Sequence, residues 1–199
     1  IVFGDWSSDV CSSDLNPKPG FNLDSAKMLL AEAGWKDKNP DGYLVKDGKI
    51  FEIDMPFSKG MDRYLTIFQE DLKKAGIKLN LSETDAPTLF KLGNERNFTI
   101  INISWSGMPV PNPDSYLSSA SADNVNSTNW PGVKDAKIDE LISKYNGAFE
   151  REERIKYLRQ IDEIACSYFP YVFGWYGPYQ RIAFQNKFGY PECILSRTD

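Results

Sequence analysis

The first half of the chain alternates between apolar stripes at helical spacing and apolar residues at every second position. In LDSAKMLLAEAGW, four apolar side chains recur at helical spacing, with Asp24 where an N-cap residue belongs and Gly34 where a left-handed C-terminal residue belongs. After a polar turn, FEIDMPF alternates Phe51, Ile53 and Met55 with acidic residues, the period-two pattern of a half-buried strand. The pattern predicts a helix that ends at Gly34 and then a strand over 51–57.

A second and a third unit repeat this order. RYLTIFQEDLKKAGIKLNLSE places Leu65, Phe68 and Leu72 on one helical stripe, ends the helix at Gly76 and continues directly into an alternating strand. A short helix in APTLFKLGNE then leads into FTIINISW, whose three isoleucines leave little polar face and favour a central strand. Repeated helix–strand units predict an α/β domain with helices against a mostly parallel sheet.

The second half of the chain is predicted to be helical and then rich in aromatic residues. AKIDELISKYNGAF and EREERIKYLRQIDEIACSYF each align apolar residues on one face, and the second helix crowds acidic residues into its first turn, as the helix dipole prefers. The residues on the two stripes are Ile138, Leu141, Ile142 and Tyr145, and then Ile155, Leu158, Ile161, Ala165 and Tyr168. PYVFGWYGPYQRIAF, which follows, has the composition of a long strand or a hairpin.

The N-terminal segment breaks this regularity. DWSSDVCSSDL, from Asp5 to Leu15, has no apolar periodicity, and its lone cysteine has no nearby Cys or His partner. One legal codon spelling of this stretch matches a common short-read sequencing adapter. We therefore predict that residues 1–14 are an artefact without structure and that the protein begins near Asn16. Because the genuine N-terminus is then absent, and ILSRTD ends the chain without a cap or last strand, we expect the chain to be cut at both ends.

The charge balance favours small molecules or proteins as partners. The formal net charge is −5, and removing three aspartates of the N-terminal segment leaves −2, a near-neutral chain without the basic surface that nucleic acids or anionic lipids attract. No apolar run reaches the roughly 18 residues needed to cross a bilayer. Cys166 and Cys193 could pair in an oxidising compartment, but buried or incidental thiols are the favoured interpretation.

The residue types argue against catalysis. The chain has no histidine, which removes the usual general base of Ser and Cys hydrolases and the commonest metal ligand. SKGMDR and SWSGMP lack the further glycines of a phosphate or dinucleotide loop. Carboxylate pairs could serve a glycosidase, yet Asp and Glu here lie mainly at the spacings of solvated helix faces. We expect neither an enzyme nor a cofactor or metal.

Binding is better supported, at the end of the most apolar predicted strand. ISWSGMPVPNPDSYL places Trp105 there, followed by the small residues Ser106 and Gly107. In open α/β sheets ligands lie beyond the carboxyl ends of strands, small residues admit a ligand to backbone N–H groups, and tryptophan offers a flat surface. Trp105 as a plain core aromatic is equally compatible with this pattern.

Two further aromatic clusters carry the same ambiguity. FGWYGPY places Trp175 and Tyr176 between glycines, where they suit either a wet cleft or a domain boundary. Trp130, in the loop NSTNWPGVKD, is expected to pack between elements rather than to contact a ligand.

The ordered set of motifs resembles a known family. AKMLLAEAGW, LKKAGIKLNL, the strand ending SW, NPDSYLSS, NWPGVKDAKIDELI, EREERIKYLRQIDEI and PYVFGWY are similar to the C-terminal half of family-5 extracellular solute-binding proteins, the peptide and nickel receptors of ABC importers. The tail WYGPYQRIAFQNKFGYPE resembles the microcin C and oligopeptide branch.

This resemblance implies the C-terminal lobe of a two-lobed periplasmic-binding-protein fold of type II, with an incomplete mixed sheet flanked by helices. Residues 15–169 would form most of the second ligand-binding lobe, and residues 170–199 a strand segment that returns toward a first lobe. It further implies a monomer without enzymatic activity or cofactor, located in the periplasm or anchored by lipid at the cell surface. Its partners would be a peptide or peptide-like solute and the permease subunits in the membrane.

One position departs from the family pattern. Peptide-binding relatives typically carry an acidic residue three positions after the strand-end tryptophan, where it holds the free ammonium of the ligand. Here that position is Met108, which leaves Asp114 as a weaker substitute and admits blocked, modified or non-peptide ligands. The predicted ligand-binding residues are Trp105, Ser106, Gly107, Asp114, Trp175 and Tyr176. The alternative function is a carboxylate-dependent glycoside hydrolase or a carbohydrate-binding domain.

Overall fold

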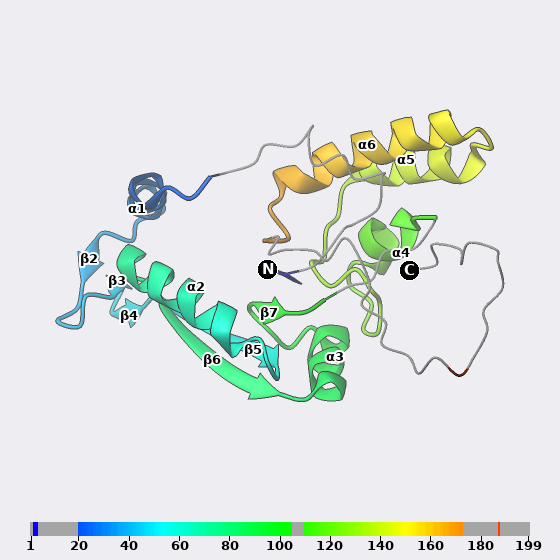
Figure 1. Cartoon of the computed structure of the whole chain (residues 1–199). Helices are drawn as coiled ribbons and strands as arrows, with labels where there is room; N and C mark the ends of the chain where they lie inside the picture. Colours follow the sequence, from blue (N-terminus) through cyan, green and yellow to red (C-terminus); the bar gives the residue numbers. More distant parts are fainter. Residues whose placement is uncertain (1, 4–19, 105–109, 173–186, 188–199) are drawn as a thin grey trace. The chain divides into compact units, whose positions relative to one another are not determined.

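The chain forms two compact units, which we describe separately. The structure is a computed structural model that describes residues 2–3, 20–104, 110–172 and 187 (Figure 1). The first unit comprises residues 1–2 and 17–103, and the second comprises residues 3–16 and 104–199. Among the described residues, no helix is both long and apolar enough to cross a membrane.

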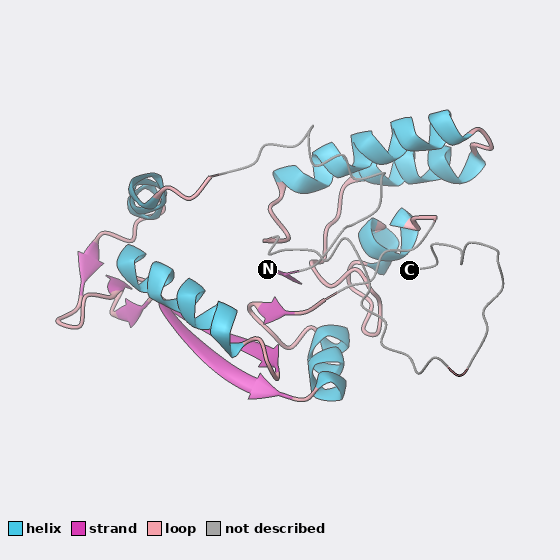
Figure 2. Ribbon diagram, in the orientation of Figure 1, coloured by secondary structure: helices cyan, strands magenta, loops and turns pink. Residues whose placement is uncertain are grey.

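The first unit alternates helices and strands, as the sequence predicts (Figure 2). In chain order its elements are α1 (Leu23–Glu32), β2 (Asp37–Lys38), β3 (Leu44–Lys46), β4 (Lys49–Ile50), β5 (Glu52–Ser58), α2 (Asp62–Ala75), β6 (Lys78–Thr84), α3 (Ala86–Glu95) and β7 (Ile101–Asn102). The short strands β2, β3 and β4 form an antiparallel sheet, whereas β5 and β6 pair in parallel. The predicted alternation of helices and strands is therefore confirmed, whereas the mostly parallel sheet is not, because among the described strands β2, β3 and β4 pair antiparallel and β5 and β6 pair in parallel.

The β5–α2–β6 segment forms the framework of this unit. Figure 1 shows α2 lying along the two long strands, and Met55 and Leu79 on the strands are buried together with Leu65 on the helix. The opposite face of the strands is polar, since the Asn80 side-chain amide donates to the carboxylates of Glu52 (2.6 Å) and Asp54 (2.8 Å). The predicted alternation of FEIDMPF is confirmed.

Gly76 ends α2 at the predicted position. Its φ of 91° lies in the left-handed region, and its N–H donates to the carbonyls of Leu72 and Lys73, which satisfies the last turn of the helix. Its own carbonyl accepts a hydrogen bond from the Leu44 N–H at 2.7 Å. A Cβ atom at Gly76 would lie 2.8 Å from Leu44 Cγ, so both the backbone conformation and the close packing require glycine here.

The start of α1 differs from the prediction. The N-cap is Asn22, whose side-chain oxygen accepts the Ser25 N–H at 2.9 Å, and Asp24 lies inside the first turn. Asn22 prevails because its extended backbone lets its side chain reach an unpaired N–H of the first turn. Gly34, with φ 92°, follows the helix end as predicted. No residue of α1 is buried.

The predicted strand over 98–105 is much shorter in the structure. Only β7, Ile101–Asn102, is a strand, and it pairs with the two-residue β1 (Val2–Phe3). Ile100, Ile101 and Ile103 are buried as expected. The apolar run therefore predicts a buried segment correctly. It does not predict the length of the strand, because β7 pairs with β1, which has only two residues. Apart from Val2 and Phe3, the predicted N-terminal artefact lies outside the described residues.

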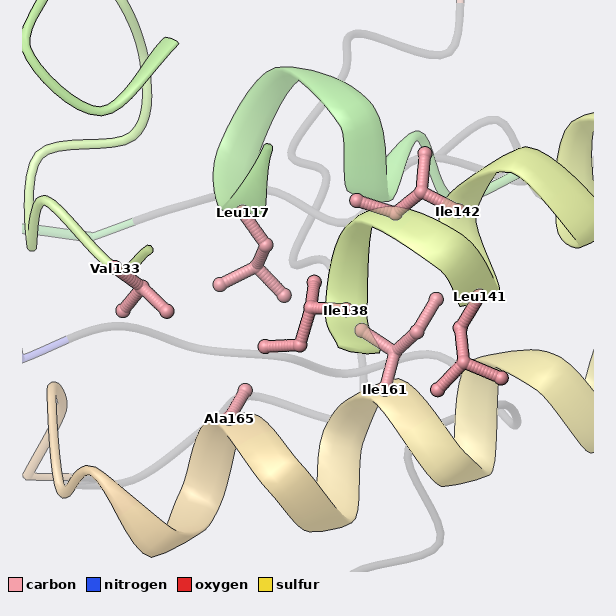
Figure 3. Close-up of a cluster of buried hydrophobic side chains, with 7 residues drawn as sticks. All are labelled: Leu117, Val133, Ile138, Leu141, Ile142, Ile161 and Ala165. Carbon is pink, nitrogen blue, oxygen red and sulfur yellow. The ribbon is translucent and has the colours of Figure 1, made fainter. Parts of the chain in front are cut away.

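The second unit, in its described part, consists of helices around one apolar cluster. Its elements are α4 (Pro113–Leu117), the 3-10 turn η1 (Ser119–Ser121), α5 (Ala136–Gly147) and α6 (Arg151–Ser167). Figure 3 shows side chains from α4, α5 and α6 gathered in this cluster. Its members are Leu117, Val133, Ile138, Leu141, Ile142, Ile161 and Ala165.

The helical stripes predicted for α5 and α6 are largely confirmed. All four predicted residues of α5 are buried, as are Ile161 and Ala165 of α6, whereas Ile155 and Leu158 of α6 are only partly buried. Tyr168 is an exception, because α6 ends at Ser167 and Tyr168 leaves the helical stripe as the C-cap. It is exposed, and its hydroxyl donates to Asp135 Oδ2 at 2.6 Å. The aromatic segment predicted as a strand or hairpin lies almost entirely outside the described residues.

Candidate functional site

Asp114 is the predicted ligand-binding residue that falls within the described part of the chain. It is exposed in the first turn of α4, the short helix that begins after the N-cap Asn112. Met108 lies outside the described residues, as do the other predicted ligand contacts, which are Trp105, Ser106, Gly107, Trp175 and Tyr176. Their roles remain predictions.

Asp114 lines an open cavity of about 390 Å³ at the surface between α4 and α5. Its lining consists of Asp114, Ser118, Ala120, Asp139, Ile142, Ser143 and Asn146. Four of these belong to α5, at successive spacings of three, one and three residues that place them on one side of the helix. Two carboxylates, two hydroxyl groups and one side-chain amide thus meet above the buried Ile142. Asp114 was predicted from the sequence to bind a ligand, a role that stays a prediction, whereas its neighbours on α5 were not predicted.

The N-terminal end of α5 is fixed by Asp135. Its carboxylate accepts the N–H groups of Lys137 (2.7 Å) and Ile138 (3.0 Å), the arrangement of an N-cap. The hydrogen bond from the Tyr168 hydroxyl, followed by that from the Ile138 N–H, lowers the pKa of the Asp135 carboxyl. The same bond raises the pKa of Tyr168. These contacts tie the start of α5 to the end of α6.

Asn129 holds the loop between η1 and α5. Its side chain is fully buried and donates to the carbonyls of Ser118 (3.0 Å) and Val133 (3.1 Å), while its Oδ1 accepts the Val133 N–H. Thr128 Oγ1 donates to the Ser115 carbonyl at 2.6 Å. These bonds connect the loop to α4 and to the wall of the cavity at Ser118. The turn sequence NWPG, which is typical of a tight reversal of the chain beside Asn129, is the signal from which the structural role of Asn129 could have been predicted.

Tyr145 anchors the segment that enters α4. Its ring is buried, and its hydroxyl donates to the Pro111 carbonyl at 2.6 Å, across 34 residues of sequence. The guanidinium of Arg154, on α6, lies 4.3 Å from the centre of the ring, a cation–π arrangement. Trp130 is also buried, in agreement with the packing role expected for it.

The one cysteine in the described part of the chain has a raised pKa, and these residues contain no cluster suited to a metal ion. Cys166 is a free, half-buried thiol that lies 3.7 Å from Asp162 Oδ1. Burial, followed by the nearby Asp162 charge, raises the pKa of Cys166 to about 11, which disfavours the reactive thiolate. Among the described residues, no group of three or more His, Cys, Asp or Glu side chains could hold a metal ion. Cys193 lies outside the described residues.

Comparison with known proteins identifies the family. Residues 6–128 match the bacterial extracellular solute-binding proteins, family 5, a match that begins within the predicted N-terminal artefact. The oligopeptide-binding protein AppA of Bacillus subtilis is 31% identical over 179 residues, covering 87% of this chain and 33% of AppA. The uncharacterized protein YejA of Escherichia coli is 30% identical, covering 85% of this chain and 28% of YejA. The chain thus spans about a third of the length of these relatives.

Solved structures agree with this assignment. AppA of Bacillus subtilis in complex with a nonapeptide aligns with a TM-score of 0.73 and 29% identity, over 82% of this chain and 33% of that one. NikZ of Campylobacter jejuni in complex with Ni(L-His) aligns with a TM-score of 0.62 and 26% identity, over 76% of this chain and 31% of NikZ. The predicted fold, an incomplete part of a periplasmic binding protein, is therefore confirmed. This chain belongs to the family-5 bacterial extracellular solute-binding proteins.

Proposed function

We propose that this chain is part of the substrate-binding component of an ABC importer that captures oligopeptides or peptide-like solutes. The observation that carries this proposal is the similarity to AppA in both sequence and structure, together with the nonapeptide bound to AppA. The permease subunits in the membrane receive the solute, and the protein acts as a monomer in the periplasm or as a lipid-anchored protein on the cell surface.

In this proposal residues 15–169 form most of the second ligand-binding lobe, and residues 170–199 return toward the first lobe. Trp105, Trp175 and Tyr176 provide aromatic surface for the solute, while Ser106 and Gly107 offer backbone donors. Binding in a two-lobed receptor depends on contacts that form only when both lobes enclose the solute. The chain alone therefore binds weakly, and the full-length receptor binds well.

The protein has no catalytic role in this proposal. The absence of histidine from the sequence removes the commonest general base and metal ligand, and the relatives named above are binding proteins or uncharacterized. The peptide is favoured over a nickel complex such as that bound to NikZ, because AppA is the more similar of the two in sequence and in fold.

The test is to express the full-length protein and measure peptide binding by calorimetry, with a nonapeptide and a tripeptide as probes. We expect saturable binding accompanied by a change in tryptophan fluorescence. Trp105→Ala should then weaken affinity by about 1–3 kcal/mol, the scale of a central aromatic contact, with little loss of folding stability. Binding of oligosaccharides or of a nickel–histidine complex without binding of either peptide would contradict the proposal.

If Trp105→Ala instead leaves affinity unchanged and lowers stability by about 3–5 kcal/mol, the scale for a buried tryptophan, Trp105 is a core residue. That outcome would withdraw its assignment as a ligand contact.

A further inference from the structure

We propose that the apolar face of α1 docks against the part of the full-length protein that this chain does not contain. The face consists of Leu23, Ala26, Leu29, Leu30 and Ala33. It is a packing surface within one polypeptide and includes none of the residues predicted to contact a ligand. The inference rests on membership of the family and goes beyond peptide capture, so each proposal can fail without the other.

The face has the spacing of a packed helix but not its burial. Its residues follow one another at intervals of three, three, one and three, which places them on one side of the helix. No residue of α1 is buried. Helix α1 lies beside α2, yet Leu29 is 59% exposed and Ala33 is exposed as well. The contact with α2 therefore uses only part of the face.

Helix α1 is short for a helix without buried residues. It has ten residues, whereas helices below about 12–15 residues are marginal in water and gain most of their stability from packing of an apolar face. Polar contacts hold both of its ends, because Asn22 caps the first turn and Lys46 Nζ donates to the Ala33 carbonyl at 2.9 Å. These bonds fix the helix in place, and a docking partner would add the burial that the face lacks.

The length of the relatives indicates where that partner comes from. In both sequence and structure the matched part is 33% of AppA, so most of AppA lies outside it. Because this chain belongs to the same family, the full-length protein has further chain to pack against α1. A partner in the same polypeptide is present at a high effective concentration. A contact of modest area is then sufficient for docking.

Two other occupants fit the face less well. A helix of ten residues is about 15 Å long, and one face of it cannot bury the roughly 1,200–2,000 Å² of a stable interface between separate proteins. This argues against a second copy of the chain. The charged residues of α1 are Asp24, Lys27 and Glu32, a negative balance that anionic lipids do not attract. This argues against a membrane surface.

The experiment is hydrogen exchange followed by mass spectrometry on the full-length protein, with no ligand added. We expect the amides of residues 23–33 to exchange at least about tenfold more slowly in the full-length protein than in the 199-residue chain, because docking raises the free energy of local opening. Leu29→Asp in the full-length protein should remove most of this protection, since it places a charge in a docked apolar face. In the chain the same substitution should change little, because Leu29 is exposed there.

Met28→Asp is the matched control. Met28 is 56% exposed, close to the value for Leu29, but it lies about 100° around the helix and outside the apolar face. Met28→Asp should therefore keep the protection of α1 in the full-length protein. Peptides from α5 and α6 should exchange equally in both variants, which separates undocking of α1 from general unfolding.

Three results would overturn the proposal. The first is equal exchange of α1 in the full-length wild type and its Leu29→Asp variant, a comparison that does not require the chain to fold alone. The second is equal loss of protection in the Leu29→Asp and Met28→Asp variants, which would assign the effect to the helix itself. The third is protection of α1 in the chain that rises with dimer formation in sedimentation, or with added anionic vesicles, which would assign the face to a second copy or to a membrane.

Discussion

Helices α1 and α5 have similar signals in the sequence but very different surroundings in the structure. Both have apolar residues at helical spacing and an N-cap side chain that binds the first turn. In α5 the predicted apolar residues are buried, with Ile138 at 0% exposure. In α1 no residue is buried, and Met28 and Leu29 are 56% and 59% exposed. Periodicity and caps thus determine where a helix forms, whereas burial depends on what the rest of the protein packs against it.

The difference between α1 and α5 can be tested by shortening one apolar side chain in each helix. Ile138→Ala should destabilise the chain by about 2–5 kcal/mol, because it opens a cavity in the cluster of Figure 3. Leu29→Ala, the matched change in α1, should stay within about 0.5 kcal/mol. Urea unfolding followed by circular dichroism measures both values. Equal effects would show that α1 is packed as firmly as α5.

The ends of helices allow a second test, with glycine as the probe. Gly76→Ala should cost about 1–3 kcal/mol, because alanine disfavours a positive φ and its Cβ would collide with Leu44. Gly147, in the last turn of α5, has open space around it and no positive φ. Gly147→Ala should therefore be neutral or stabilise by up to about 1 kcal/mol. A loss of stability at Gly147 would mean that the end of α5 is also tightly packed.

A pH titration can show what anchors the start of α5. The bond from Tyr168 lowers the pKa of Asp135, so its contribution to stability is present above the unfolded pKa, near 4, and is lost as pH falls through the folded pKa. The same bond raises the pKa of Tyr168. The stabilisation by this hydrogen bond is therefore also lost at high pH, as the pH rises through the pKa of Tyr168 in the folded protein.

Tyr168→Phe should accordingly lower the thermal midpoint at neutral pH by a small amount. The difference between the wild type and the variant should shrink in acid and in strong alkali, where one partner of the bond has changed its charge. A midpoint difference that is constant at every pH would assign the effect of Tyr168 to packing instead of the hydrogen bond.

The smallest effect is expected for the segment that precedes α1. Deletion of residues 1–14 should shift the thermal midpoint by no more than about one degree, since a two-residue strand such as β1 contributes little pairing. Differential scanning calorimetry provides the measurement. If the deletion lowers stability by several kcal/mol, the segment is a genuine part of the fold and the adapter interpretation is wrong.

The sequence predicted the elements better than their boundaries and neighbours. Helix α3 was placed correctly, as were the strand β5 and the glycine that ends α2, because each depends on local periodicity or backbone conformation. The strand around Ile101 was predicted too long, since strand length depends on a partner that is remote in sequence. Asn22 outcompeted Asp24 as the N-cap because the choice between neighbouring polar residues depends on backbone geometry.

The candidate site was less accessible to sequence reasoning. Asp114 was proposed only through the family resemblance, as a substitute for the acidic residue absent at Met108, and nothing local in the sequence connects it with Asp139 and Ser143 on α5. Their proximity depends on how α4 packs against α5, through the buried cluster that contains Leu117 of α4 and Ile138 of α5 (Figure 3). Contacts between segments that are distant in sequence cannot be predicted from a single sequence unless a known motif implies them.

The parallel pairing of β5 and β6 also governs the order in which the chain can fold. Asp54 lies opposite Asn80, 26 residues later, so the ladder cannot close until the whole of α2 has been synthesised. Helices α5 and α6 are separated by only residues 148–150, and such local contacts form quickly. During synthesis β5 therefore lacks its partner β6 until α2 has been made. A strand with an unpaired edge is prone to aggregate. The helical pair emerges later yet is exposed to this hazard for a shorter time.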